Sequence, residues 1–374
     1  MNYVKLKDVC TINMGQSPSS DSYNENGHGV PFFQGNADFG ERYPVTRKWC
    51  SAPTKIAAPE DILISVRAPI GAMNYAKEEC CIGRGLAALT PNRAKVSSEY
   101  IFWLLKGKNE ELNSKGTGST FKAIGRNILE ETLVPDISLE KQTECSIILE
   151  KVYRVILSRK QQLQKLDELV KARFVEMFGD FKSITKVSLA EISDFVTVGI
   201  ANSATHAYAE SGIVMLRNQN IKENYLDERD LIYITPGFAK KYGSKKLAEN
   251  DILVIRTGYP GVACLVPKKY EGCQTFTTLI VRLKVPTLAH ANYVCHYINS
   301  SFGKDYVEQS KVGVAQQNFG AKALARMPIK IPSMALQEQF AAFVERVNKS
   351  KAAVQKALDE AQLLFDSLMQ KYFG

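Results

Sequence analysis

Residues 334–374 read MALQEQFAAFVERVNKSKAAVQKALDEAQLLFDSLMQKYFG, and this stretch decides the architecture of the chain. It contains no proline, and its only glycine is the last residue. Its apolar residues recur every three or four positions and so form a seam along one face of a helix. Lys351 is the one charged residue in this seam. The spacing predicts a single long helix whose apolar seam requires a partner. The seam follows the heptad pattern of a coiled coil, with Phe340, Val344, Val347, Val354, Leu358, Ala361, Phe365, Leu368 and Tyr372 on one side.

A second stretch of the same kind occupies residues 138–180. About 40 helical residues at 1.5 Å each span about 60 Å, which is too long for one domain to cover. We therefore predict that the two helices pair, in antiparallel fashion, because each follows its own globular segment and this arrangement needs the least connecting chain. Packing of each helix only on its own globular segment is the alternative. The seam positions of the first helix are Leu149, Val152, Ile156, Leu163, Leu166, Val170 and Phe174.

The globular segments ahead of the two helices also repeat. DILISVR at 61–67 is echoed by DILVIR at 251–256, and YIFWLL at 100–105 by YVCHYI at 293–298. We expect Asp61 and Asp251 to be turn formers at strand starts. Short apolar runs predict strands at 62–66, 86–89, 253–255 and 279–283, and the three-and-four periodicity of 98–106 and 291–299 predicts helices. The sequence thus predicts an α+β fold in which two duplicated mixed domains, 1–137 and 181–333, are each followed by a long helix, 138–180 and 334–374.

The charge of the chain fits an acidic partner. Its 374 residues include 48 Lys and Arg against 39 Asp and Glu, a formal net charge of +9. Residues 1–180 hold 24 basic and 22 acidic side chains, a net of +2, whereas residues 181–374 hold 24 and 17, a net of +7. Such an excess is compatible with binding to nucleic acid.

The start of the sequence is not leader-like, and no uncharged apolar stretch reaches about 18 residues. The eight cysteines include no CxxC pair. We therefore expect a cytoplasmic protein with reduced thiols and no membrane contact.

Common catalytic motifs are absent from the sequence. It lacks the G-x-x-x-x-G-K-[ST] phosphate loop, the H-E-x-x-H zinc motif and the G-x-S-x-G nucleophile motif. Cys295 and His296, with His290, are the nearest approach to a set of metal ligands, and we expect them to be structural. We predict a binding protein with no catalytic residue, no metal and no cofactor of its own.

The segments that open the two helices carry a resemblance to a known family. VPDISLEKQ at 134–142 and IPSMALQEQ at 331–339 share the pattern Pro-x-x-x-Leu-x-x-Gln, which matches Gln142 with Gln339. Each segment follows a variable globular half, and each helix ends near Phe-Gly. This ordered set, present twice, resembles the specificity subunit of type I restriction–modification systems over the full chain.

The resemblance implies a function for each part. Each globular half would be a target-recognition domain that reads one half of a bipartite double-stranded DNA sequence. The paired helices would set the gap between the half-sites and dock two modification (methyltransferase) subunits. Separate restriction (endonuclease and translocase) subunits would join the complex, and S-adenosylmethionine, ATP and Mg would be bound by the partner subunits. The chain itself would be a non-catalytic subunit of a complex for adenine methylation and DNA cleavage.

Side chains that can contact base edges or phosphates gather in loops of both halves. The adjacent amides of residues 316–318 suit the edges of adenine. Two other hypotheses stay open, namely a stand-alone DNA methyltransferase or nuclease with an unrecognised active site, and a coiled-coil scaffold that binds no DNA. The DNA-binding candidates are Gln16, Ser17, Gln34, Asn36, Arg84, Ser119, Thr120 and Lys122 in the first half and Arg217, Asn218, Gln219, Arg256, Tyr259, Gln316, Gln317 and Asn318 in the second.

Overall fold

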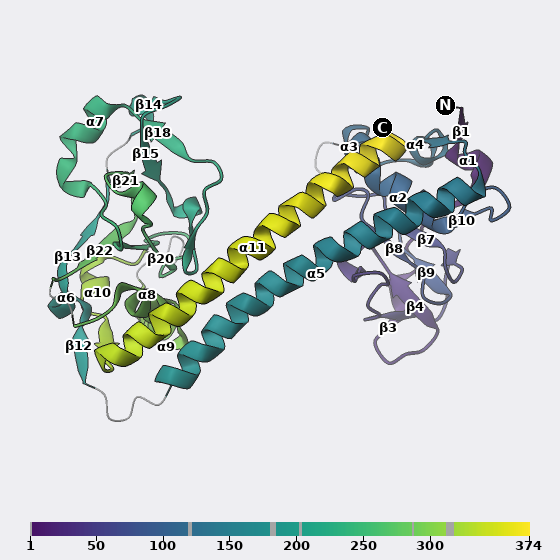
Figure 1. Cartoon of the computed structure of the whole chain (residues 1–374). Coiled ribbons are helices and arrows are strands. Elements are labelled where there is room, and N and C mark those ends of the chain that lie inside the picture. Colours follow the sequence, from purple (N-terminus) through teal and green to yellow (C-terminus); the bar gives the residue numbers. More distant parts are fainter. Residues whose placement is uncertain (1, 119–121, 180–184, 202–203, 286–287, 312–317) are drawn as a thin grey trace. The chain divides into compact units, whose positions relative to one another are not determined.

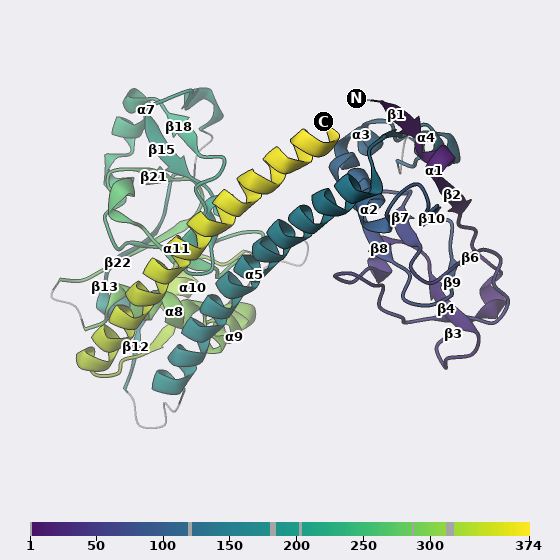
Figure 2. The same cartoon turned by 45° about the vertical axis from the view of Figure 1, so that its right-hand side comes forward.

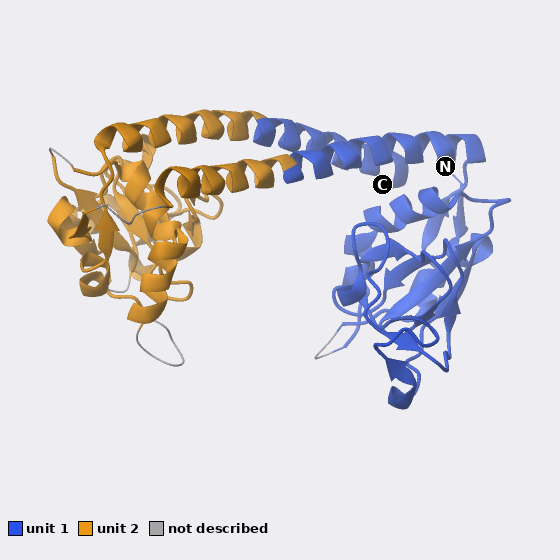
Figure 3. Cartoon of the chain, turned by 90° about the horizontal axis from the view of Figure 1, so that it is seen from below, with its two compact units in different colours: residues 1–161, 354–374 blue, residues 162–353 orange. Residues whose placement is uncertain are grey.

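The computed structural model describes residues 2–118, 122–179, 185–201, 204–285, 288–311 and 318–374. The chain divides into two compact units, which Figure 3 distinguishes by colour. Unit 1 consists of residues 1–161 and 354–374, and unit 2 of residues 162–353. The division crosses both long helices, because each helix contributes apolar side chains to both cores.

The described residues of unit 1 form two sheets and a two-stranded ribbon. β1 (Tyr3–Lys5) pairs with β11 (Leu133–Pro135), which ties the start of the globular part to its end. One sheet is antiparallel with the order β2-β10-β7-β8, and the other has five strands in the order β3-β5-β4-β9-β6. The remaining elements are β2 (Cys10–Met14), β3 (Tyr23–Asn24), β4 (Val30–Phe33), β5 (Trp49–Cys50), β6 (Ile56–Ala57), β7 (Ile62–Ser65), β8 (Met73–Tyr75), β9 (Cys80–Ile82), β10 (Leu86–Pro91), α1 (Leu6–Val9), α2 (Ser98–Gly107), α3 (Asn109–Ser114) and α4 (Arg126–Glu130).

Unit 2 repeats this plan with a modified second sheet. β12 (Lys186–Ser188) pairs with β23 (Pro328–Lys330), and the main sheet has the order β13-β22-β19-β20. A four-stranded sheet of order β14-β18-β15-β21 and the hairpin β16-β17 complete the unit. Its elements are β13 (Ser193–Val198), β14 (Tyr208–Ala209), β15 (Ile213–Leu216), β16 (Ile221–Lys222), β17 (Tyr225–Leu226), β18 (Ile232–Ile234), β19 (Ile252–Val254), β20 (Ala263–Leu265), β21 (Gln274–Thr275), β22 (Leu279–Leu283), α6 (Leu189–Ile192), α7 (Pro236–Lys241), α8 (Ala291–Asn299), α9 (Ser301–Ser310) and α10 (Ala321–Ala325).

The predicted strands and helices are confirmed within a residue or two at each end. β7, β10, β19 and β22 occupy the four apolar runs, and all four form the centres of antiparallel sheets. Their side chains are buried on both faces, which explains why these runs are continuously apolar and do not alternate. α2 and α8 occupy the two segments with helical periodicity.

Asp61 and Asp251 act as turn formers, as predicted. The Asp61 Oδ2 accepts a hydrogen bond from the Ala58 backbone N–H at 2.9 Å, and Asp251 Oδ2 accepts one from Ala248 at 2.8 Å. Asp251 is also paired with the guanidinium of Arg282 at 2.7 Å. Each carboxylate therefore closes the turn that leads into the central strand.

The two long helices are α5 (Leu139–Phe178) and α11 (Met334–Phe373), each of 40 residues. Their first and last residues correspond at a constant offset of 195. The sequence pattern that matched Gln142 with Gln339 is therefore wrong by two positions, and the structural counterpart of Gln142 is Gln337. Burial supports this, because Gln142 and Gln337 are both buried whereas Gln339 is exposed.

In unit 1 the beginning of α5 and the end of α11 share one core. Leu149 and Ile156 of α5 are buried together with Phe365 and Phe373 of α11. The Phe365 ring lies 5.7 Å from the ring of Trp103 on α2. The half-buried seam side chains packed against this core are Val152, Leu358, Ala361, Leu368 and Tyr372.

In unit 2 the end of α5 shares a core with the beginning of α11. The ring centroids of Phe174 in α5 and Phe340 in α11 lie 5.4 Å apart. Both rings belong to the core that also contains the apolar side chains of α8. The other seam residues in this core are Leu166, Val170, Val344 and Val347. Leu163 is half-buried and Val354 is buried.

Since the start of each long helix lies beside the end of the other, the antiparallel coiled coil is confirmed. Figures 1 and 2 follow the two helices side by side in each unit. The alternative in which each helix packs only on its own globular segment is wrong, because each core contains seam residues of both helices.

Candidate nucleic-acid interface

In unit 1 three candidate segments meet where the parallel strands β4 and β9 end. Gln34 follows β4, and Arg84 lies two residues after β9. Gln34 Nε2 donates to Ser17 Oγ at 2.9 Å, and the Arg84 backbone N–H donates to the same oxygen at 3.3 Å. Ser17 thus links both strand ends, while the side chains of Gln16, Gln34 and Arg84 are exposed.

Glycine permits this close approach of three loops. A Cβ at Gly85 would lie 2.4 Å from the carbonyl oxygen of Gln34, and a Cβ at Gly15 would lie 2.2 Å from that of Gly83. Both neighbours are backbone atoms, so any other residue would force the loops apart. The cluster of Gln16, Ser17, Gln34 and Arg84 is therefore built into the backbone.

The Lys122 segment reaches the same end of unit 1 through the backbone. The backbone carbonyl of Val66 accepts a hydrogen bond from the Ile124 N–H, and the Val66 N–H donates to the Gly85 carbonyl, each at 2.9 Å. The Lys122 carbonyl accepts from the Ala68 N–H at 3.0 Å. Lys122 itself is exposed. Asn36 is half-buried at the start of a 3-10 turn (Asn36–Asp38) just beyond Gln34. Ser119 and Thr120 lie outside the described residues.

In unit 2 the candidate residues come together in a comparable way. Asn218 Nδ2 donates to the Thr257 carbonyl oxygen and to Thr257 Oγ1, both at 3.3 Å. Arg256 Nε donates to Asn318 Oδ1 at 3.1 Å. The loops after β15 and β19 and the strand-like residue Asn318 therefore form one surface, which also includes the neighbouring Arg217 and exposed Gln219. Gln316 and Gln317 lie outside the described residues.

Tyr259 stands out from this surface. Its side chain is 82% exposed, whereas most tyrosines of the chain are buried or half-buried. It lies between two glycines with positive φ, Gly258 at 86° and Gly261 at 95°, which shape the loop between β19 and β20. An aromatic ring held out on a shaped loop is suited to stacking on, or wedging against, bases.

The two clusters occupy equivalent places in the repeat. Gln34 follows β4 and Arg217 follows β15, and each of these strands has a parallel neighbour, β9 or β21. The bridge between Arg67 and Ala123 in unit 1 corresponds to the bridge between Thr257 and Asn318 in unit 2. The same fold thus presents two different sets of side chains from the same edge.

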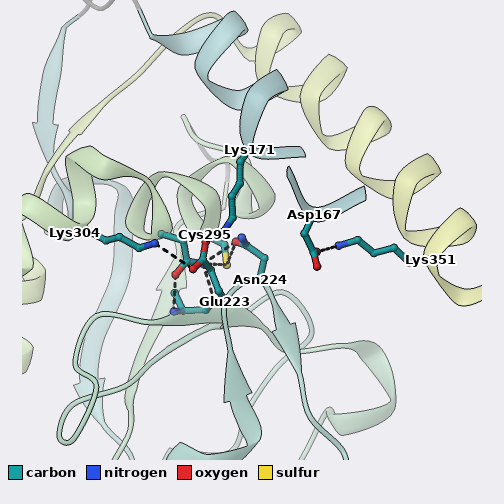
Figure 4. Close-up of polar contacts among 9 residues, drawn as sticks. Asp167, Lys171, Glu223, Asn224, Cys295, Lys304 and Lys351 are labelled. Atoms are coloured by element: carbon teal, nitrogen blue, oxygen red, sulfur yellow. Dashed lines mark hydrogen bonds and ion pairs between the residues drawn. The ribbon is translucent and has the colours of Figure 1, made fainter. Parts of the chain in front are cut away.

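A second polar cluster of unit 2 centres on Glu223 (Figure 4). Glu223 in the β16-β17 turn pairs with Lys171 of α5 at 2.9 Å and with Lys304 of α9 at 3.1 Å. Burial acts to raise the pKa of the Glu223 carboxyl, but the bonds from the two lysines outweigh it and the pKa is lowered. The neighbouring Asn224 accepts from Asn299 Nδ2 at 2.7 Å. This cluster fastens the hairpin to α5.

The Lys351 ammonium pairs with the Asp167 carboxylate across the two helices (Figure 4). Lys351 is half-buried, so its chain packs in the seam while its head reaches the partner helix. This contact favours a register-setting role for Lys351, because a polar seam residue with a fixed partner disfavours slipped pairings.

Thr257 and Gln337 have structural roles that their positions in the sequence motifs do not indicate. Thr257 holds Asn218 through both of its oxygens. Gln337 is buried and makes three hydrogen bonds, and alignment of the helices at a constant offset would have found it. His290 caps α8 by accepting from Asn292 at 3.2 Å, a structural role of the kind expected for it.

In the described ranges, no group of three or more His, Cys, Asp or Glu residues could hold a metal ion. No helix in that part of the chain combines the length and apolar character needed to cross a membrane. The eight cysteines are free thiols, and all but Cys273 are buried.

Comparison with known proteins agrees with this geometry. The family model described as "Type I restriction modification DNA specificity domain" matches residues 1–168 and again residues 183–361. A curated relative from Methanocaldococcus jannaschii, provisionally named the MjaX specificity subunit of a type I restriction enzyme, is 40% identical over 160 residues. This match covers 43% of the chain but only 38% of the relative's own length.

Two more distant matches span nearly the whole chain. The type I restriction enzyme EcoBI specificity subunit of Escherichia coli is 19% identical over 98% of the chain and 83% of its own length. The crystal structure of a type I restriction–modification system S subunit from M. genitalium covers 100% of the chain and 96% of that protein, with 12% identity and a TM-score of 0.62, and so shares the fold. With both halves matched by one family model, the resemblance seen in the sequence is confirmed, and the chain belongs to the type I restriction modification DNA specificity domain family.

Proposed function

We propose that this chain is the sequence-reading subunit of a type I restriction–modification complex and that it binds a bipartite double-stranded DNA target. Unit 1 would contact one half-site and unit 2 the other. The observation that carries the proposal is the pair of equivalent polar clusters, around Ser17 and Gln34 in one unit and around Asn218 and Arg256 in the other. Both combine amide, hydroxyl and guanidinium groups, the groups that contact base edges and phosphates.

The difference between the clusters supports two different half-sites. Unit 1 offers Gln16, Gln34, Arg84 and Lys122 on its loops, whereas unit 2 offers Arg217, Gln219, Arg256 and Tyr259. Since direct readout depends on which donors and acceptors face the groove, two sets on one repeated fold would read two sequences.

The long helices would dock two methyltransferase subunits. Their outer faces carry large apolar side chains that neither unit covers, among them Ile147 at 49%, Val155 at 45% and Leu363 at 73% exposure. A hollow of about 400 Å³ beside α5 in unit 1 has Ile147, Glu150, Arg154 and Arg42 among its lining residues. Exposed apolar side chains next to charged ones are typical of protein interfaces. S-adenosylmethionine, ATP and Mg would then belong to the partner subunits.

Sequencing of DNA methylation in cells with and without this chain tests the proposal. We expect one bipartite methylated motif to disappear with the chain and to return when it is restored. If no motif is lost, the chain does not direct methylation, and that result would favour the coiled-coil scaffold that binds no DNA. A methylated motif that persists in a reconstituted reaction without any methyltransferase partner would instead favour the stand-alone enzyme.

Variants of each cluster assign the half-sites. Replacing Arg84 by Ala should weaken selection at one half of the motif only, and replacing Arg256 by Ala at the other half only. Glu78→Ala, at an exposed position between β8 and β9 of unit 1, serves as a surface control. Equal effects of both arginine variants on both halves would contradict the division of reading between the units.

A further inference from the structure

A buried glutamine stands near the start of each long helix. Gln142 in α5 is 1% exposed and Gln337 in α11 is 0% exposed. Glutamine is mostly found at protein surfaces, and a buried amide is tolerated only when its polar atoms are hydrogen-bonded. The two positions are related by the constant offset of the helices, so the feature is duplicated with the fold.

In unit 1 the Gln142 amide makes three hydrogen bonds. Oε1 accepts from the backbone N–H of Ser97 at 2.9 Å, and Nε2 donates to the carbonyl oxygens of Lys95 at 3.2 Å and Ile137 at 2.9 Å. Ser97 is the N-cap of α2, and Ile137 lies just ahead of α5. One side chain therefore joins the long helix, the segment that enters it and the helix at the centre of the unit 1 core.

In unit 2 the Gln337 amide makes the same three bonds to equivalent partners. Oε1 accepts from the backbone N–H of His290 at 2.8 Å, and Nε2 donates to Leu288 at 3.2 Å and to Pro332 at 2.9 Å. His290 is the N-cap of α8, as Ser97 is of α2. The repetition of every partner in two halves with different loops points to a requirement of the architecture rather than of one local sequence.

A tyrosine adds a fourth hydrogen bond to the same joint in each unit. Tyr100 Oη donates to the Pro135 carbonyl oxygen at 3.4 Å, and Tyr293 Oη donates to Lys330 at 2.6 Å. Both carbonyls belong to the last strand before the long helix, β11 or β23. We call Gln142 with Tyr100, and Gln337 with Tyr293, the helix locks.

The geometry of the joint matters because the helix is a long lever. The cores around the joints are apolar, and apolar contacts are non-directional. Hydrogen bonds weaken steeply when their angles change, so three bonds from one planar amide resist rotation of the helix on the domain. A tilt of about 10° at one end of a helix of 40 residues would displace its other end by about 10 Å. On DNA that is about three base pairs at 3.4 Å each.

We propose that the helix locks are positioning residues that fix the angle between each recognition domain and its long helix, and thereby the spacer length accepted between the two half-sites. The inference rests on the proposed function. It assigns spacer selection to two buried joints, in addition to helix length, and it assigns no contact with DNA to the residues of the locks.

The test uses the full chain assembled with its methyltransferase partners, and the variants Gln142→Met and Gln337→Met. Methionine keeps the length of the side chain and removes all three hydrogen bonds. Gln339→Met is the matched control, because Gln339 lies two residues further along the same helix and is exposed. The substrates are duplexes with both half-sites of the mapped motif and with spacers of the native length or one or two base pairs longer or shorter.

We expect the wild-type chain and the Gln339→Met control to methylate only the native spacer efficiently. For the two lock variants, the ratio of the methylation rate on the native spacer to the rate on the altered spacers should fall by about tenfold or more. Single-base changes inside each half-site should reduce methylation as much as they do for the wild type. If methylation falls equally on all duplexes and the ratio between native and altered spacers is unchanged, the glutamines contribute only to stability. That result would overturn the inference.

A milder variant covers the case in which a methionine variant does not fold, which circular dichroism would reveal. Tyr293→Phe removes one hydroxyl and one hydrogen bond without changing the shape of the ring, and it should shift spacer preference in the same direction by a smaller factor. An unchanged preference in Tyr293→Phe would then count against the locks. Failure of the wild-type complex to require both half-sites would refute the proposed function instead, so the two outcomes are distinguishable.

Discussion

The end of α11 should be essential for the stability of unit 1, although 192 residues separate it in sequence from the rest of that unit. Phe365 is 7% exposed and packs 5.7 Å from Trp103 and 5.9 Å from Tyr153, measured between ring centroids. Replacing Phe365 by Ala removes a buried ring and leaves a cavity, which costs about 3–5 kcal/mol in the free energy of unfolding. For a unit of this size the loss lowers the melting temperature by about 6–20 °C.

The assay takes advantage of the position of the tryptophans. The chain has two, Trp49 and Trp103, and both belong to unit 1. Tryptophan fluorescence during urea unfolding therefore reports on this unit alone. Leu363→Ala is the matched control, because Leu363 lies two residues away on the same helix and is 73% exposed, so its loss should change stability by no more than about 0.5 kcal/mol.

The result that would refute the reasoning is equally specific. If Phe365→Ala shifts the fluorescence transition by less than about 1 kcal/mol, or no more than Leu363→Ala does, the end of α11 does not belong to the core of unit 1. The antiparallel pairing described for this unit would then be wrong.

Three further predictions concern pH, DNA binding and helix length. Burial lowers the pKa of His296 to about 4, below its usual 6.5, so the unfolded chain binds a proton that the folded chain does not, and stability should fall as the pH drops from 6.5 towards 4. Between pH 7 and pH 5 this contributes a loss of about 2 kcal/mol, which His296→Gln should abolish in urea unfolding followed by circular dichroism, whereas an identical pH dependence of the variant and the wild type would contradict it. Tyr259→Ala should weaken binding of the mapped DNA target by about 1–3 kcal/mol in fluorescence anisotropy with no change in melting temperature, because the ring is exposed, and unchanged affinity would remove Tyr259 from the interface. Four residues inserted in both α5 and α11 add about 6 Å to each helix and should lengthen the gap between the two half-sites of the methylated motif by one or two base pairs. Insertion in one helix alone should instead break the pairing register of the two helices. If the gap between the half-sites is unchanged after the matched insertion, the helices do not set its length.

Much of the fold is predictable from local pattern, and the reason is visible in particular elements. The central strands β7 and β19 are buried on both faces, so their runs of Ile, Leu and Val have no polar alternation and are easily recognised. The seam of α11 is equally clear because side chains three and four residues apart lie on one face of a helix. The duplication of both signals reveals the two halves without any structure.

The candidate DNA-binding residues were harder to group. Ser17, Gln34 and Arg84 are far apart in sequence, and only the ends of β4 and β9, with glycines that allow close backbone contact, bring them together. Similarly, Asn218 meets Thr257 through loops of different sheets. Polar loop residues have no periodicity, so the pattern of the sequence alone does not reveal which of them share a surface.

The correspondence of Gln142 with Gln337 shows how a short pattern can mislead. Proline and leucine at similar spacings favoured Gln339, because such residues recur near the starts of many helices. Hydrogen bonds to Ser97 and Ile137 in one unit, and to His290 and Pro332 in the other, identify the true counterpart.

By itself the sequence determined that the chain consists of one domain and one long helix, each written twice, because apolar periodicity and repetition are local properties of the chain. Only the tertiary structure decided which side chains of the two helices complete each core. Phe365 and Phe373 contribute to unit 1, and Phe174 and Phe178 to unit 2. The reason is that a heptad seam specifies that a helix must pair, whereas the domain surfaces at its two ends, through aromatic packing on Trp103 or Tyr293, fix the place where each end is buried.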